Sequence, residues 1–462
     1  MKYLILLFIP LQLFSQKTSV LFQNVNVIDV QTGKVSGNQN VLIVGNRIEK
    51  ITSKAVARKN ATVVNGTGKF LIPGLWDMHV HIFNNVSERP PNEYYHPLFI
   101  ANGVCSVREM WTKPKNIHYI NRWRTDAETQ LVVIPRYIEV GTLVDGVPPS
   151  WPNSDTVTNA EEGRAMVREV KAGGVDFFKV YGRLSREAYF AIAEECKKLN
   201  FPFAGHVPLG ITLAEASNAG QKSQEHLGFW EMFTELSAKE EKFKNIKPAD
   251  LTPALRLELL QSLSEQKCSS LAEVFVKNRT ALCPTIIQYR VAMIGDDDSI
   301  KKDSRLNYAD SSDKRKWAEF AARFKPENRL LREVRYQKGL DIIRMMHSGG
   351  VQLLAGTDLG NPFLYAGFSL HDELALFVQA GLSPMSALQT ATINPAKYAG
   401  KEKESGTVTQ GKIADLVLLD ANPLKDISNT KKINAVVVNG RLLSRKDLDR
   451  LLQQAKEMIR DL

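Results

Sequence analysis

The middle of the chain alternates short apolar segments of β-strand character with segments of helical periodicity, and this alternation limits the possible folds most strongly. In the helical segment 184–199, apolar residues recur at helical spacing and Ser185 stands at a typical N-cap position. Strands that alternate with helices form parallel sheets, and about 250 residues suffice to close eight such units into a barrel. The sequence therefore predicts an α/β fold with a (β/α)8 TIM-like barrel. Its clearest strand segments are 69–82, 176–181, 201–207, 281–289 (predicted as strand seven) and 351–358.

Two β-like segments lie outside this alternation, at 20–64 and 414–443. The first carries a hairpin signal at Gly45-Asn46, and the strands of the second are bounded by Gly or Pro. We expect these two distant pieces to form one small β-sandwich. The predicted division is a signal peptide at 1–16, the sandwich at 17–66 and 401–445, the barrel at 67–400 and a C-terminal helix at 446–462.

Residues 1–16 have the pattern of a secretory signal peptide, with Lys2 followed by an apolar run and then Phe14-Ser15-Gln16. The apolar run is shorter than the ~20 residues that cross a bilayer. A first β-strand or a membrane anchor are the alternatives. We expect a secreted or periplasmic protein with no stable membrane insertion after signal cleavage.

The composition fits a globular enzyme and favours no macromolecular partner. Hydrophobic residues make up 44% and charged residues 24% of the chain, close to the values for soluble globular proteins. The net charge of +10 would allow contact with nucleic acid, but a chain of 462 residues can spread it thinly. In 301–335 the basic residues alternate with acidic ones, which is typical of an exposed helix. We expect no nucleic-acid partner.

The four cysteines include no CxxC pair. Cys105, Cys196 and Cys283 lie inside apolar segments, where free cysteine behaves as a small buried hydrophobic residue. We therefore expect buried free thiols, although an exported protein could pair them.

His79 and His81 close the first strand of the predicted barrel. Because side chains alternate along a strand, both imidazoles point to the same side and can bind one metal ion. An HxH pair alone is a weak signal, since two incidental polar residues give the same pattern.

The surrounding segment IPGLWDMHVH resembles the strand-one signature of the amidohydrolase superfamily, and the later strands resemble it in order. The similarity extends to the segments SGTVTQGKIADLVLLDANPL and AVVVNGRLL, so it covers almost the whole mature chain. Within the superfamily, the segments most resemble those of the dipeptidase and imidazolonepropionase-like members. The resemblance implies metal ligands on strands four, five, six and eight, which here are Lys179, His206, His226 and Asp358.

The resemblance further implies two divalent metal ions, for which we expect zinc. His79, His81 and Asp358 would bind one ion and His206 and His226 the other, with a carboxylated Lys179 and a hydroxide between them. Carbon dioxide would supply the carboxyl group of Lys179. An alternative is a lysine paired with a neighbouring carboxylate, because burial of a free ammonium group is costly.

The implied activity is hydrolysis of a C–N (amide) bond in a small molecule, either a dipeptide or a cyclic amide. Asp358 would be the catalytic acid–base group, and the alternatives are a lactone, ester or phosphoester hydrolase and a non-catalytic binding protein. The sequence is compatible with a homo-oligomer and does not determine the oligomeric state. Tyr181, Tyr289 and Arg290 are expected near the ends of strands four and seven as substrate contacts, while His371 either contacts substrate or caps a helix.

Overall fold

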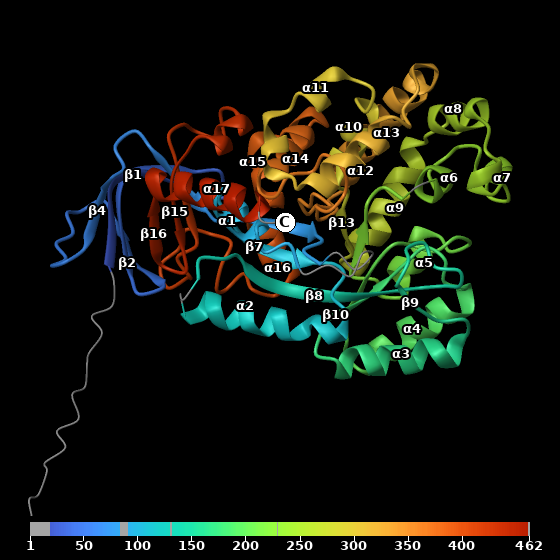
Figure 1. Cartoon of the computed structure of the whole chain (residues 1–462), viewed down its shortest axis with the longest axis horizontal. Helices are drawn as coiled ribbons and strands as arrows, with labels where there is room; N and C mark the ends of the chain where they lie inside the picture. Colours follow the sequence, from blue (N-terminus) through green and yellow to red (C-terminus); the bar gives the residue numbers. More distant parts are fainter. Residues whose placement is uncertain (1–18, 84–90, 130–131, 229, 461–462) are drawn as a thin grey trace, which may run out of the picture.

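Parallel strands at the centre of the molecule form a nearly closed barrel (Figure 1). The computed structural model describes residues 19–83, 91–129, 132–228 and 230–460. Neighbouring barrel strands pair in the order of the chain, and a short strand β9 (Asp155–Thr156) pairs with the third of them. The predicted barrel fold is confirmed. Its regular strands are β6 (Leu75–Val80), β7 (Val104–Glu109), β8 (Arg136–Asp145), β10 (Phe177–Val180), β11 (Phe203–Gly205), β12 (Ser223–Glu225) and β13 (Ala281–Cys283).

Residues 352–359 fill the eighth position without forming a regular strand. The backbone N–H of Leu354 donates to Leu282 O (2.9 Å), and the N–H of Met78 donates to Ala355 O (2.9 Å). These bonds close the barrel between β13 and β6. The strand predicted at 351–358 is therefore in the right place, but it makes only isolated bridges to its neighbours.

The predicted seventh strand at 281–289 is correct only for its first residues. β13 ends at Cys283, and the rest of the segment begins helix α10 (Ile286–Met293). The buried Glu373 carboxylate accepts hydrogen bonds from the N–H groups of Ile286 (3.0 Å) and Ile287 (2.8 Å). These N–H groups at the helix start thereby gain a partner 86 or 87 residues away in sequence.

Helices cover the outside of the barrel (Figure 1). The N-cap predicted at Ser185 is confirmed, because its side chain accepts a hydrogen bond from the N–H of Ala188 (3.1 Å). These helices are α1 (Tyr95–Ala101), η1 (Pro114–Asn116), α2 (Ile117–Thr129), α3 (Ala160–Ala172), α4 (Arg186–Lys198), α5 (Leu213–Asn218), α14 (Phe368–Gln379), α15 (Pro384–Thr390) and α16 (Ile393–Tyr398).

A long helical insertion separates β12 from β13 and β13 from the eighth position, as the charged helical pattern predicted. It lies at the upper right of the barrel in Figure 1. Its elements are α6 (Glu231–Glu235), α7 (Glu240–Phe243), η2 (Pro248–Asp250), α8 (Pro253–Gln261), α9 (Glu265–Asn278), α10, α11 (Asp298–Lys301), η3 (Ser304–Tyr308), α12 (Ser311–Ala321), η4 (Pro326–Asn328) and α13 (Arg329–Ser348).

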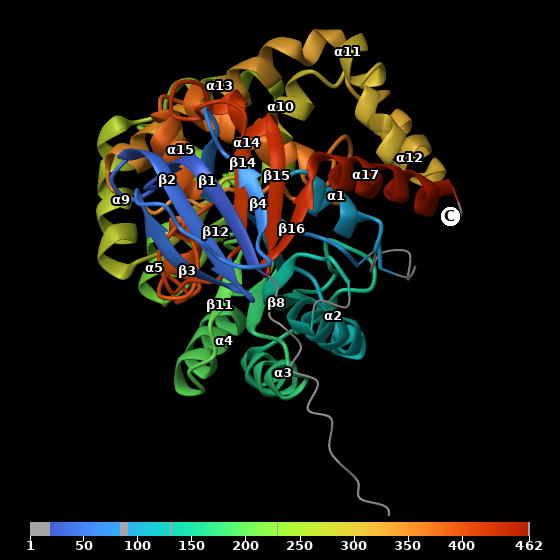
Figure 2. The same ribbon diagram turned by 90° about the vertical axis from the view of Figure 1, so that its left-hand side faces the viewer.

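The two terminal β segments join in one sheet beside the barrel, and Figure 2 shows their strands side by side. Antiparallel pairing of β5 with β14 connects the two halves of the sheet. At the edge formed by β3, the N–H of Ile48 donates to Lys412 O (2.9 Å), so this edge also contacts the C-terminal segment. Both terminal segments thus contribute to one sheet that has its own apolar core, as the sequence predicted for these two distant pieces. Its strands are β1 (Ser19–Ile28), β2 (Val35–Val44), β3 (Arg47–Thr52), β4 (Thr62–Asn65), β5 (Phe70–Pro73), β14 (Leu416–Leu419), β15 (Ile433–Val438) and β16 (Arg441–Ser444).

The remaining elements are η5 (Ile427–Lys431) and the C-terminal helix α17 (Arg445–Arg460), which packs along α1 (Figure 1). All four cysteines are buried and free, as predicted. The proposed signal peptide lies outside the described residues. Across the described ranges, no helix combines the length and the apolar character needed to span a membrane.

Candidate metal centre

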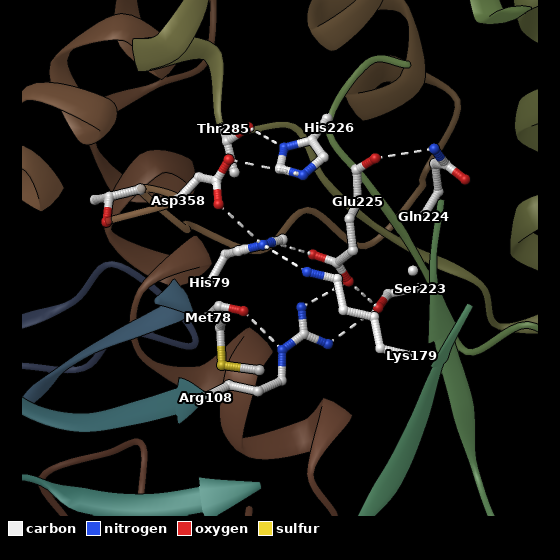
Figure 3. Close-up of polar contacts among 12 residues, drawn as sticks. Met78, His79, Arg108, Lys179, Ser223, Gln224, Glu225, His226, Thr285 and Asp358 are labelled. Atoms are coloured by element: carbon white, nitrogen blue, oxygen red, sulfur yellow. Dashed lines mark hydrogen bonds and ion pairs between the residues drawn. The ribbon is translucent and has the colours of Figure 1, made fainter. Parts of the chain in front are cut away.

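The six predicted ligands lie together at the C-terminal ends of the barrel strands. Each comes from a strand end or the residues directly after it: β6, β10, β11, β12 and the eighth position. All are buried or nearly so, and Figure 3 shows His79, Lys179, His226 and Asp358 pointing toward one another. The full set is His79, His81, Lys179, His206, His226 and Asp358.

Asp358 is the centre of the cluster. Its Oδ1 lies 3.2 Å from His79 Nε2 and 3.1 Å from His81 Nε2, and its Oδ2 lies 3.8 Å from His226 Nε2. His79, His226 and Asp358 each offer a ligand atom within 4.8 Å of the others. Imidazole nitrogens with a carboxylate are a donor set that suits zinc and similar divalent ions, so these residues fit a metal.

Lys179 lies inside this cluster, with Nζ 3.5 Å from His79 Nε2. Its side chain is only 1% exposed, and burial lowers its pKa to about 8, although Asp358 and Glu225 act in the opposite direction. Among the residues that the structure describes, no carboxylate lies within ion-pair distance of Lys179. The alternative of a simply paired lysine therefore gains no support.

His206 lies at the other side of the cluster. Its ring centroid is 4.8 Å from that of His226 and 4.0 Å from that of Tyr181. Residues of a small pocket surround it, among them Gly182, Leu213, Gln224 and Met232. Among the predicted ligands, His206 is the one that lines this pocket.

A second layer of buried polar residues orients His79 (Figure 3). Glu225 Oε2 lies 2.8 Å from His79 Nδ1, and the Arg108 guanidinium donates to Glu225 Oε1 (2.7 Å) and to Met78 O (2.6 Å). Burial raises the pKa of Glu225, but Arg108 and His79 lower it further, so the pKa lies well below its usual range. The ionised carboxylate fixes the imidazole so that Nε2 faces the cluster.

Three residues with left-handed backbone conformations stand at the strand ends next to this centre. They are His226 (φ 62°), Thr285 (φ 45°) and Asp358 (φ 57°). Thr285 Oγ1 lies 2.7 Å from His226 Nδ1, which turns His226 Nε2 toward Asp358. Residues other than glycine rarely adopt such φ values, and backbone strain of this kind is common at functional sites.

Two further carboxylates support the strands that carry the ligands. Asp77 accepts hydrogen bonds from Thr357 N (3.0 Å) and Thr357 Oγ1 (2.7 Å), which ties β6 to the eighth position. Glu109 accepts from Ile82 N (2.6 Å) and lies 4.0 Å from His81 Nδ1. Burial raises the pKa of Asp77 to about 6 and that of Glu109 to about 7.

Of the four predicted substrate contacts, one lies at the ligand cluster, and the other three lie on helices. Tyr181 packs on His206. Tyr289 and Arg290 lie on α10 rather than at a strand end; the Tyr289 hydroxyl donates to Gly228 O (2.8 Å). His371 on α14 has both ring nitrogens 3.0 Å from protein oxygens, Thr430 Oγ1 and Asn102 O, so it joins segments of the scaffold.

Several residues of the site were not predicted from the sequence. Gln288 and Asn361 both donate to Asp358 Oδ2, the latter at 2.8 Å. Strand alternation would turn the side chain of Glu225, directly before His226, away from the ligand side, so the sequence pattern did not mark it. Nothing in the local sequence marks Arg108 or Gln288.

Comparison with known proteins identifies the family but not the substrate. The amidohydrolase family profile matches residues 70–443. Among solved structures, a bottromycin amidohydrolase has a TM-score of 0.75 at 23% identity, covering 96% of this chain and 90% of that one. A Xaa-Pro dipeptidase with bound methionine has a TM-score of 0.64 at 19% identity, covering 92% of this chain and 100% of that one.

At these identities the two structures establish a common fold. A curated relative, adenine deaminase of Clostridium botulinum (strain Loch Maree / Type A3), is 37% identical over 68 residues, which is 15% of this chain. The match spans only 10% of the length of that deaminase. The family match covers most of the chain, including every strand of the barrel, and on that basis the chain belongs to the amidohydrolase family.

Proposed function

We propose that this enzyme hydrolyses an amide bond of a small molecule at a centre that holds two divalent metal ions, most simply zinc. The observation that carries the proposal is the convergence of four histidines, a buried lysine and an aspartate on the strand ends of one barrel. The ions would supply Lewis-acid activation of water and of the substrate carbonyl. His79, His81 and Asp358 would hold one ion, and His206 and His226 the other.

Lys179 is proposed to be carboxylated. In this reaction the neutral Nζ amine attacks the carbon of carbon dioxide, an N–C bond forms as one C=O π bond opens, and one N–H proton leaves to water. The product is an anion whose two oxygens can each bind a metal ion. The burial of Lys179 and its position 3.5 Å from His79 Nε2 support this proposal, because a carbamate bound to metal ions would replace a buried ammonium group that has no carboxylate partner among the described residues.

Asp358 is proposed to move the proton. Its carboxylate lies against the imidazoles of His79 and His81, and Asn361 donates to its Oδ2. From this place it would accept a proton from the attacking water and deliver it to the leaving nitrogen. Side-chain donors hold the carboxylate in one orientation for both transfers.

The proposed substrate class is a dipeptide or a cyclic amide. The solved structures of similar fold include a bottromycin amidohydrolase and a Xaa-Pro dipeptidase, and the curated relative with a short match is a deaminase, so all three names concern C–N bonds. A similar centre could also cleave lactones, esters or phosphoesters, so these belong in the same activity screen.

The test combines metal content with activity. We expect about two equivalents of divalent metal in the purified protein, and a lower content with lost activity in His206→Ala. His118→Ala is the matched control, because His118 is exposed and bonds to Lys115 O. A metal-free protein with full activity would refute the proposal, and faster turnover of lactones than of amides would refute the substrate class.

The carboxylation has its own test. Removal of carbon dioxide during reconstitution with metal should lower the activity, and bicarbonate should restore it. Lys179→Ala should lose both the activity and the response to bicarbonate. Equal activity with and without bicarbonate, together with an unmodified Lys179 in the mass spectrum of intact, metal-bound protein, would contradict it.

We also propose that residues 1–16 direct export. The support is the sequence pattern of Lys2 followed by an apolar run. Cell fractionation and N-terminal sequencing of the full-length protein test this, and an uncleaved protein in the cytoplasm would contradict it.

A further inference from the structure

The loop between β8 and β9 holds a partly exposed tryptophan close to the candidate metal centre. Trp151 is 42% exposed. Its indole N–H donates a hydrogen bond to the Tyr181 hydroxyl (2.7 Å), and the Tyr181 ring lies 4.0 Å from the ring of His206. Trp151 is thus separated from a predicted metal ligand by a single side chain.

Hydrogen bonds to one buried carboxylate hold the backbone of this loop. The buried Asp145 carboxylate accepts hydrogen bonds from the N–H groups of Gly146 (2.9 Å), Ser150 (2.7 Å) and Arg183 (2.7 Å). The Arg183 guanidinium in turn donates to Pro148 O (3.0 Å). The loop is therefore held in one conformation, and a ligand that packs on the indole would lose little free energy in ordering it.

Two buried aromatic side chains, Tyr181 and Trp111, back Trp151 and extend toward the opposite side of the centre. Trp111 packs with Leu143 and Tyr181, and its ring centroid lies 6.5 Å from that of His81. Trp111, Tyr181 and Trp151, which we name the aromatic wall, therefore link the surroundings of His81 to those of His206.

Exposed apolar side chains flank the wall on the neighbouring loops. Val147 is 60% exposed in the Trp151 loop, and Leu209 is 52% exposed in the loop after β11, where its N–H lies 3.4 Å from Gly182 O. Apolar surface that a folded chain holds exposed at a binding site is typical of a ligand subsite.

We propose that the aromatic wall binds an apolar side chain of the amide substrate and that Trp151 determines this specificity. The inference rests on the proposed amidohydrolase function. An apolar group would bury the exposed indole face, whereas a polar group of the same size would lose hydration against the rings. Discrimination by one such contact is about ten-fold or more.

The test uses pairs of dipeptides that differ only in leucine versus asparagine, at the first or the second position, since these side chains have similar size and different polarity. We expect the wild type to have a kcat/KM about ten-fold higher for the leucine member of at least one pair. Trp151→Ala should remove most of this preference, mainly through a higher KM. Trp151→Phe should retain it, because it keeps an aromatic face.

Val276→Ala is the control, since Val276 is an exposed apolar residue on α9, shortly before the start of β13 and so at the opposite end of the barrel. It should leave the preference unchanged. An equal loss of activity toward both members of the pair in Trp151→Ala would overturn the proposal, because it would indicate a structural role alone.

Failure of the proposed function is recognised separately, as absence of hydrolysis by the wild type. Binding of N-acetyl-leucinamide and N-acetyl-asparaginamide to the metal-loaded protein, measured by calorimetry, then tests the wall alone. Tighter binding of the leucine compound that is lost in Trp151→Ala supports it, and equal binding of both compounds by the wild type overturns it.

Discussion

At the scale of single residues, the buried pair of Arg108 and Glu225 connects the barrel interior to His79. We predict that Glu225→Gln weakens metal binding by ~10–100-fold, because the His79 imidazole loses the carboxylate that orients its Nε2 atom. Metal retention during dialysis against a chelator measures this. Glu195→Gln is the control, since Glu195 on α4 is also buried but pairs with Arg168 outside the barrel. Unchanged metal affinity with lowered stability would mean that Glu225 serves only as the counter-ion of Arg108.

At the scale of elements, the irregular eighth position depends on a close approach to β6. A Cβ atom at Gly356 would lie 2.5 Å from Cys283 Sγ and 2.8 Å from His79 Cβ. We predict that Gly356→Ala lowers the free energy of unfolding by ~1–3 kcal/mol and reduces activity, because the segment that carries Asp358 must move away from His79. Urea unfolding and a kinetic assay measure both effects. Gly37→Ala on β2, where the nearest atom is Asn26 Oδ1 at 3.3 Å, should change neither; wild-type behaviour of Gly356→Ala would show that the eighth position can shift freely.

At the scale of the whole molecule, the buried His371 joins three parts of the chain: α14, the residue after α1 and η5. Burial, together with the charge of Lys431, lowers its pKa to about 4. Since an exposed histidine has a pKa of about 6.5, protons bind the unfolded chain more strongly. This contribution to stability is complete above pH 6.5 and is lost as the pH falls toward 4, by about 2 kcal/mol at pH 5.

His371→Gln should therefore show a smaller fall in the free energy of unfolding between pH 7 and pH 5 than the wild type, by about 2 kcal/mol. Urea titrations at the two pH values measure the difference, and the comparison cancels the acid sensitivity of the metal-site histidines that both proteins share. An equal fall in both proteins would mean that His371 has the same pKa in the folded and the unfolded chain, and would contradict the prediction.

The sequence by itself determined the barrel and its terminal β segments, and its resemblance to the amidohydrolase superfamily implied the later ligands that meet His79 and His81 at one end of the barrel. Such inference works because a parallel barrel brings the C-terminal ends of all its strands to one face, so His79, Lys179 and Asp358 converge whatever the details of packing. The spacing of apolar residues and the turn signals are local properties, and they suffice to locate strands and helices.

Only the tertiary structure decided which polar groups pair across the barrel. Arg108 pairs with Glu225, which is far away in the sequence. Glu373 accepts hydrogen bonds from the first residues of helix α10, almost ninety residues earlier in the chain, so the segment after Cys283 became helix instead of strand. Likewise, the Trp151 indole reaches the Tyr181 hydroxyl because Asp145 holds the loop that carries Trp151. Each of these contacts depends on the free energy of burying a charge or a polar group with its partner, and that partner is fixed only when the barrel closes.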